Sequence, residues 1–337
     1  MKTKIIITYG PAIKDYETLE KAVSMADIVR INFSHGSEEE WSKAISNVRS
    51  ISKKLGKVTD IMADLPGPKI RIAKMDEAKK IKKGEEVVFS FEGDMVVPGS
   101  IPIEYDLIKY CKPGAAIYIG DGELKLAIIG IGKREIRCRS YFDGLIGSRK
   151  GISLEDLEVD AEPPTEDDIS LLGFALENKC EIIAESFVRN AENVRKLREA
   201  VTNSKIISKI ERKDALENID DIVNESDMIM VARGDLALNV SFEKLPEAQA
   251  LIIDAANRGE TPFIMATEVL ASMVSKPVPT RAEVSDIANA VSNNAYGIML
   301  SNETSVGKFP LEAIEMLRSC IGTAENVKMR KSSQKGL

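Results

Sequence analysis

Residues 204–236 read SKIISKIERKDALENIDDIVNESDMIMVARGDL and contain the unit from which the whole chain is built. Two short apolar runs, Ile206–Ile210 and Met228–Ala232, enclose a polar stretch of helical character. Runs that are apolar on both faces are typical of strands in a buried parallel sheet. The segment therefore predicts two parallel strands joined by a helix, and each strand runs into charged residues at its carboxyl end.

The same unit recurs in both directions along the chain. Eight apolar runs alternate with helical stretches: Ile5–Tyr9, Ile28–Phe33, Thr59–Leu65, Glu181–Glu185, Ile206–Ile210, Met228–Ala232, Phe263–Ala266 and Ile298–Leu300. Capping boxes at Ser37–Glu40, Thr165–Asp168 and Thr280–Glu283 predict helix starts between them. Eight such units predict an α/β fold, a (β/α)8 TIM barrel, with a doubly wound open sheet as the alternative.

One segment interrupts the alternation. Residues 71–150 hold short β-rich runs separated by glycine-containing turns, which predicts a small all-β domain inserted after the third strand. The barrel would then comprise residues 1–70 and 151–327, and the basic residues 328–337 would form a disordered tail. We expect the inserted domain to act as a lid, because it leaves the barrel on the active-site side. A merely decorative insertion is the alternative.

Composition narrows the class of protein. The chain has 337 residues, 44% of them hydrophobic, and a formal net charge of −7, which argues against a nucleic-acid-binding protein. No stretch approaches the roughly 20 apolar residues of a membrane span, and the apolar run at the start is too short for a secretory signal. The four cysteines form no C-x-x-C pair, so we expect reduced thiols in the cytoplasm. A single histidine, His35, excludes a multi-histidine zinc site.

Polar residues at the strand ends indicate where the chemistry lies, since barrel enzymes act at the carboxyl ends of their strands. The ends carry Arg30, Asn32, Ser34, Asp64, Ser186, Lys209, Glu211, Arg233, Gly234, Asp235, Thr267, Ser301, Asn302 and Glu303. Carboxylates and hydroxyls without histidine suit a magnesium ion, and Glu211 and Asp235 are the candidate ligands.

Positive charge surrounds the same point. Arg30, Lys209 and Arg233 would favour an anionic substrate, and the backbone amide of Gly234 could face a carboxylate or a phosphate. For any single residue, an ion pair with a purely structural role in the barrel mouth is an equal alternative. Polar and charged residues stand at the ends of all eight strands, and this convergence favours a functional role over structural ion pairs.

Several blocks of sequence resemble the pyruvate kinase family. They include Gly10-Pro11-Ala12, residues 30–36, Gly67-Pro68-Lys69-Ile70-Arg71, Lys209-Ile210-Glu211, residues 229–236, Ala266-Thr267, residues 279–283 and residues 298–304. The likeness extends from residue 3 to about residue 325. It implies a glycolytic phosphotransferase that converts phosphoenolpyruvate and ADP into pyruvate and ATP, and it also implies a barrel with an inserted β domain.

The resemblance also implies roles for individual residues. Glu211 and Asp235 would hold Mg²⁺ or Mn²⁺, and Gly234, Asp235 and Thr267 would bind the substrate carboxylate. Lys209 and Arg30 would flank the transferred phosphoryl group, and Thr267 and Ser301 would belong to the path that protonates the enolate. The residues implied near the nucleotide are Pro11, Asn32, His35, Arg71 and Lys150. Helices near Pro279–Val291 would pair two copies of the chain in a possible homodimer.

Departures from the family pattern carry their own expectations. Glu268 and Asn302 stand where glutamine and glycine are usual. The chain ends after the barrel, so we expect a short form without the C-terminal allosteric domain of most members. Lys69 and Leu65 stand where the family has glutamate and threonine.

These two departures bear on the potassium site. In potassium-requiring relatives, the equivalents of Asn32, Ser34 and Asp64 bind the ion. We expect the Lys69 ammonium to reach this oxygen cluster and replace the ion, which predicts activity without potassium.

Two other functions remain open at this stage. A metal-dependent keto-acid lyase or aldolase would use the same Glu211 and Asp235 without needing Lys209. A non-catalytic relative that senses phosphoenolpyruvate is the second alternative, and an intact Lys209 argues against it.

Overall fold

Eight apolar segments form a closed parallel barrel in the order β1-β16-β15-β14-β13-β12-β3-β2, which confirms the predicted TIM barrel. The computed structural model describes residues 2–91, 97–120, 122–154 and 162–335. The barrel strands are β1 (Lys4–Thr8), β2 (Ile28–Asn32), β3 (Asp60–Asp64), β12 (Ile182–Glu185), β13 (Lys205–Ile210), β14 (Met228–Ala232), β15 (Phe263–Ala266) and β16 (Gly297–Leu300). Each lies within two residues of its predicted run.

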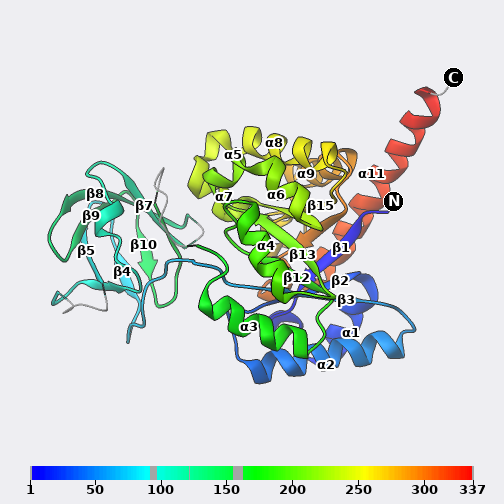
Figure 1. The fold of residues 1–337 in the computed structure, drawn as a ribbon, viewed down its shortest axis with the longest axis horizontal. Coiled ribbons are helices and arrows are strands. Elements are labelled where there is room, and N and C mark those ends of the chain that lie inside the picture. Colours follow the sequence, from blue (N-terminus) through cyan, green and yellow to red (C-terminus); the bar gives the residue numbers. More distant parts are fainter. Residues whose placement is uncertain (1, 92–96, 121, 155–161, 336–337) are drawn as a thin grey trace.

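Helices surround the barrel and follow its strands in sequence (Figure 1). They are α1 (Tyr16–Met25), α2 (Glu38–Lys54), α3 (Glu166–Glu177), α4 (Ala191–Ala200), α5 (Lys213–Glu217), α6 (Ile219–Glu225), α7 (Arg233–Val240), α8 (Leu245–Arg258), α9 (Arg281–Ser292), α10 (Asn302–Ser305) and α11 (Pro310–Lys335). Capping boxes begin α3 at Thr165 and α9 at Thr280, as predicted. Side chains such as Ile6, Met62 and Met230 fill the barrel interior, so the barrel is a packed core.

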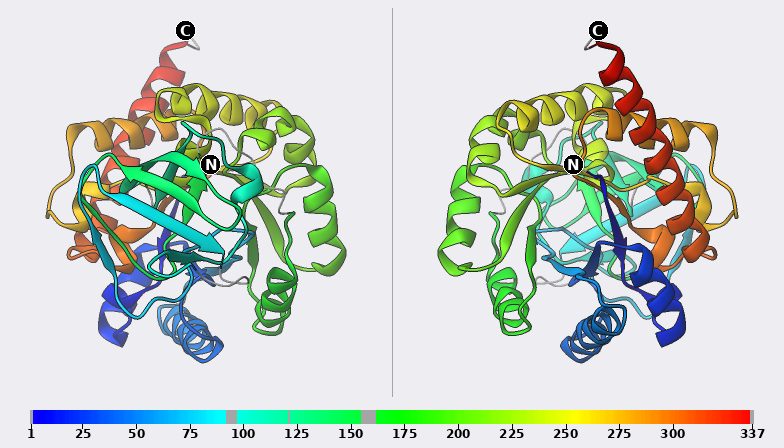
Figure 2. Two further views of the ribbon diagram at one scale, coloured as in Figure 1. Left: turned by 90° about the vertical axis from the view of Figure 1, so that its left-hand side faces the viewer. Right: turned by 90° about the vertical axis from the view of Figure 1, so that its right-hand side faces the viewer.

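The inserted domain is built from β strands and lies over one end of the barrel, opposite the N-terminus (Figure 2). Six strands form one sheet in the order β11-β7-β8-β9-β5-β6, and β10 pairs with β4. These strands are β4 (Lys79–Ile81), β5 (Glu86–Phe91), β6 (Ile101–Ile103), β7 (Ala116–Ile119), β8 (Leu124–Ile131), β9 (Ile136–Ser140), β10 (Gly144–Ile146) and β11 (Ile152–Leu154). Because β11 pairs with β7, the domain extends to Leu154 and does not end at the expected residue 150.

The C-terminal segment differs from its prediction. Helix α11 continues without a break to Lys335, whereas a disordered tail was expected from residue 328. The Lys328 ammonium donates to the backbone oxygen of Val291 at 3.1 Å, which ties this part of the helix to the end of α9. Within the described residues, no helix is both long and apolar enough to cross a membrane.

Candidate active site

A cleft of about 760 Å³ lies between the carboxyl ends of the barrel strands and the inserted domain. The predicted site residues that line it are Arg30, Asn32, Ser34, His35, Asp64, Lys69, Arg71, Lys150, Lys209, Glu211, Gly234, Asp235, Thr267 and Ser301. The inserted domain adds Gly120, Glu123, Ser148, Arg149 and Gly151. Pro11, at the start of a short 3-10 helix, is not among the lining residues. The topology therefore gathers nearly all the predicted residues in one place.

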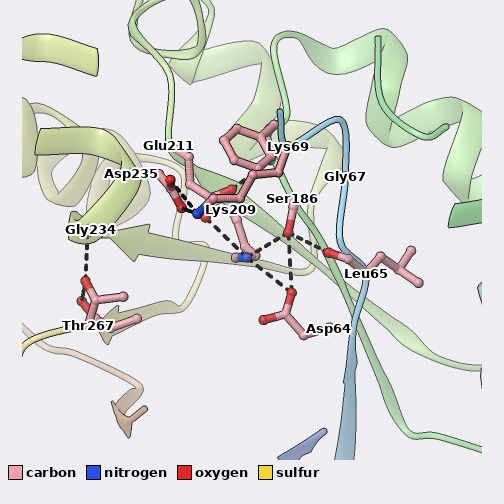
Figure 3. A network of polar contacts seen from close by, with 12 residues as sticks. Asp64, Leu65, Gly67, Lys69, Ser186, Lys209, Glu211, Gly234, Asp235 and Thr267 are labelled. Atoms are coloured by element: carbon pink, nitrogen blue, oxygen red, sulfur yellow. Dashed lines mark hydrogen bonds and ion pairs between the residues drawn. The ribbon is translucent and has the colours of Figure 1, made fainter. Parts of the chain in front are cut away.

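Lys209, near the end of β13, is the centre of a polar network on the cleft floor (Figure 3). Its ammonium donates to Ser186 Oγ at 2.7 Å and to Asp64 Oδ1 at 3.2 Å, and lies 3.2 Å from Glu211 Oε1. Burial by itself would lower the pKa of Lys209, but Asp64 and Glu211 outweigh it and raise the pKa. The network therefore keeps a buried positive charge at the mouth of the barrel.

Asp64 and Arg30 form the second part of the network. The Arg30 Nε donates to Asp64 Oδ2 at 2.5 Å, and its Nη1 donates to Thr8 Oγ1 at 3.2 Å. Burial would raise the pKa of Asp64, but Lys209 and Arg30 lower it. Asp64 is therefore an anion that orients two cations at the cleft floor.

Glu211 faces Lys209 with one oxygen and the backbone with the other. Its Oε2 accepts the Phe187 N–H at 2.8 Å. Phe187 has a φ of +59°, which few non-glycine residues adopt. Burial raises the pKa of Glu211, Lys209 lowers it, and Asp235 raises it further. A cation beside Glu211 and Asp235 would stabilise both carboxylates.

Lys69 lies elsewhere than expected. Its ammonium is 2.8 Å from Oδ1 and 3.0 Å from Oδ2 of Asp235, one of the two candidate magnesium ligands. We expected it at the oxygen cluster of Asn32, Ser34 and Asp64. The loop of residues 65–69 carries Lys69 across the cleft, whereas Asp64 belongs to β3, where Arg30 and Lys209 reach it.

Thr267 and Gly234, both predicted at the substrate carboxylate, lie in direct contact. The Gly234 N–H donates to Thr267 Oγ1 at 2.9 Å. Thr267 and Glu268 have φ angles of +64° and +52°, so this turn is held in an unusual backbone conformation.

Arg233 does not add charge to the cleft, contrary to expectation. Its guanidinium donates to the backbone oxygen of Thr267 at 2.6 Å and also pairs with Asp286 on α9. As the first residue of α7, it points behind the Thr267 turn and supports it.

The rim of the cleft is positively charged. Burial lowers the pKa of His35, and Arg71, Arg30, Lys69 and Arg149 lower it further. These cations suit an anionic ligand such as a nucleotide. The Lys150 ammonium pairs with the Glu123 carboxylate.

Sequence reasoning did not assign three residues that the structure places in these networks. Ser186 was noted as a strand end, and it donates to the Leu65 backbone oxygen at 2.6 Å while accepting from Lys209. Glu303 is buried and accepts the N–H groups of Ser301 and Leu270 at 2.7 and 2.9 Å. The strand-end rule had identified Ser186 and Glu303 without giving them a role, whereas Glu123 belongs to the inserted domain, to which the rule does not apply.

The donor set of the site is made of oxygen atoms. In the described part of the chain, no group of three or more His, Cys, Asp and Glu side chains is arranged to hold a metal. Two carboxylates, those of Glu211 and Asp235, are enough for magnesium, which proteins hold with one or two carboxylates while water and substrate supply the remaining ligands. The arrangement can therefore neutralise and orient a phosphorylated anion.

Comparison with known proteins gives a consistent result. A protein-family model described as pyruvate kinase, barrel domain, matches residues 1–314. The pyruvate kinase of Thermococcus litoralis is 39% identical over 334 residues, covering 96% of this chain and 70% of that protein. The pyruvate kinase of Staphylococcus aureus (strain MRSA252) is 36% identical over 333 residues, covering 96% of this chain and 57% of that protein. This chain thus spans less than two thirds of the Staphylococcus protein.

Proposed function

Because the chain belongs to the pyruvate kinase family, we propose that it transfers the phosphoryl group of phosphoenolpyruvate to ADP, giving pyruvate and ATP. The observation that carries this proposal is the buried Lys209 ammonium, held by Asp64, Ser186 and Glu211 beside Asp235. Phosphoryl transfer needs positioning and charge neutralisation more than covalent chemistry from the protein. A fixed, charged lysine on the cleft floor meets that need.

Magnesium or manganese would be held by Glu211 and Asp235. Bound there, the cation would neutralise charge on the substrate phosphoryl oxygens. Two observations support the fit. The donors are all oxygen atoms, and each carboxylate already has a positive charge beside it, the ammonium of Lys69 at Asp235 and that of Lys209 at Glu211.

The chain's own residues would do the remaining work. Lys209 and Arg30 would flank the phosphoryl group, and the same ammonium would stabilise the enolate that phosphoryl transfer leaves behind. The amides of Gly234 and Asp235, together with Thr267, would hold the substrate carboxylate. Thr267 and Ser301 are the candidates for delivering a proton to the enolate carbon, since each hydroxyl can both donate and accept.

The nucleotide would bind under the inserted domain. Asn32, His35, Arg71 and Lys150 line that part of the cleft, and the positive rim supports the assignment. Pro11 stays in the proposal as a neighbour of the nucleotide on the strength of the family resemblance.

Activity of this enzyme in the absence of potassium is part of the proposal. The candidate potassium ligands already have donors from the chain: Asp64 accepts from Arg30 and Lys209, and Asn32 Oδ1 accepts the Ser34 N–H at 3.1 Å. A further cation would meet positive charge at close range.

We therefore expect the wild type to reach its full rate in tetramethylammonium buffer, with less than about a twofold gain on adding potassium. Steady-state rates with and without potassium measure the effect. Strong stimulation of the wild type would contradict the proposal.

A homodimer through α9 is proposed as the assembly. Val278, just before α9, and Val284, within it, expose 62% and 36% of their surface, which supports a contact there. We expect light scattering to give twice the chain mass, and a monomer at working concentrations would refute it.

The cytoplasm is the proposed location, since a reducing compartment suits the four free cysteines.

The function itself is tested by measuring pyruvate release from phosphoenolpyruvate with magnesium, with and without ADP. We expect release only when ADP is present, with ATP formed in equal amount. Release without ADP, with inorganic phosphate formed in place of ATP, would mean hydrolysis of phosphoenolpyruvate and would overturn the kinase reaction, whereas a keto-acid lyase would release no pyruvate from this substrate. Binding of phosphoenolpyruvate without any release would favour a non-catalytic sensor.

A further inference from the structure

The loop of residues 65–69 holds Lys69 in a defined position. The Gly67 N–H donates to Asp168 Oδ1 at 2.9 Å. Gly67 has a φ of +63°, and an added Cβ would lie 2.8 Å from Ser186 Cβ, so this position requires glycine. The loop is thus docked between α3 and the end of β12, and it directs Lys69 toward Asp235.

The lysine binds the whole carboxylate. Its ammonium is 2.8 and 3.0 Å from the two Asp235 oxygens, and each side chain is 17% exposed. A divalent cation would need one of these oxygens at about 2.1 Å. A bound ammonium and a divalent cation would then lie too close together in a partly buried site.

We propose that Lys69 and the divalent cation compete for Asp235, so that Lys69 sets the metal affinity of the substrate-free enzyme and leaves the carboxylate when the metal binds. This inference rests on the proposed function, because it takes Asp235 as a metal ligand. The chain thereby carries its own counter-ion for this carboxylate.

The two lysines of the site differ in their freedom to move. Lys209 stands on a barrel strand, is 11% exposed and is fixed by Asp64 and Ser186 as well as Glu211. Lys69 stands on a loop, and its flexible four-carbon stem allows the ammonium to leave. Metal binding would therefore displace Lys69 and leave Lys209 in place.

Contact with the inserted domain offers a second way to move the lysine. Gly151 lies beneath the Lys69 stem, and an added Cβ would stand 2.5 Å from Lys69 Cε. The next two nearest atoms, at 3.4 and 3.7 Å, also belong to the Lys69 side chain. Gly151→Ala should push the stem aside while keeping its charge.

The test is calorimetric titration of Mn²⁺ into the full chain without phosphoenolpyruvate or nucleotide. We expect Lys69→Met to bind Mn²⁺ at least tenfold more tightly than the wild type, and Gly151→Ala severalfold more tightly. Lys150→Met is the matched control: it removes a lysine of the same cleft that pairs with Glu123, and it should change the affinity less than twofold.

The outcomes separate the inference from the function on which it rests. Equal Mn²⁺ affinity of wild type and Lys69→Met, or equal tightening by Lys150→Met, would overturn the competition and leave the metal site standing. Absence of binding in all variants would overturn the metal site itself, and the competition with it. Asp235→Asn should abolish the binding in every background.

Discussion

Replacing Lys209 with methionine is expected to lower kcat by on the order of 10²–10³-fold while the protein stays folded. The Lys209 ammonium is held in a fixed position at the cleft by its contacts with Asp64, Ser186 and Glu211. Methionine keeps much of the length and the apolar stem but cannot stabilise charge that develops in the transition state. Steady-state kinetics with phosphoenolpyruvate and ADP measure the loss.

Stability and activity can be separated in this experiment. Without Lys209, Asp64 keeps its bond with Arg30, whereas Glu211 loses its neighbouring cation and some stability is expected to be lost. Lys57→Met serves as the control. It removes a half-buried ammonium that donates to the Val23 and Ser24 backbone oxygens at 3.0 and 3.3 Å, remote from the cleft. It should lower the thermal midpoint with kcat unchanged, and a Lys209→Met variant that turns over normally would refute the assignment.

The part of the site that the sequence predicts correctly consists of residues at strand ends, where the barrel geometry determines which way each side chain points. Asp64, Lys209 and Glu211 end strands whose register is set by the barrel, and parallel strands all end on the same face. Alternation along β12 then explains why Ala184 packs inside the barrel, Ser186 lines the cleft and Glu185, between them, does not.

The remaining positions depend on contacts that no local pattern encodes. Arg233 ends a strand in the sequence, but it begins α7, and the turn at Thr267 presents backbone oxygens to it. Lys69 meets Asp235 across 166 positions of sequence, because Gly67 is docked on Asp168 and Ser186. The helical C-terminus was missed because its basic composition resembles a tail, although lysine, arginine and glutamine also favour helices.

Glu185 is expected to make the free energy of unfolding depend on pH in the neutral range. The residue is 1% exposed, and its two carboxyl oxygens have no hydrogen-bond partner in the described structure. Burial, with a further contribution from the Asp168 carboxylate, raises the pKa of Glu185 from 4.5 to about 8. Between these values, the folded protein keeps a proton that the unfolded chain has released.

The sign of the effect follows from this difference. When the folded state binds more protons than the unfolded state, stability falls as pH rises. Each pH unit between about 4.5 and 8 should remove about 1.4 kcal/mol, so the total loss by pH 8 is on the order of 4 kcal/mol. The contribution of Glu185 to stability is therefore fully present below pH 4.5, its pKa in the unfolded chain, and is lost as the pH rises to about 8, its pKa in the folded protein.

Glu185→Met should remove this dependence, because methionine fills similar space without a titratable group. We expect the variant to be more stable than the wild type by on the order of 4 kcal/mol at pH 8, and by about 1 kcal/mol at pH 5. Denaturant unfolding at several pH values measures the difference. Glu217→Met, which removes an exposed carboxylate on α5, should leave the slope unchanged. Parallel curves for wild type and Glu185→Met would mean that Glu185 titrates alike in the folded and unfolded chain, contrary to what its unpartnered burial predicts.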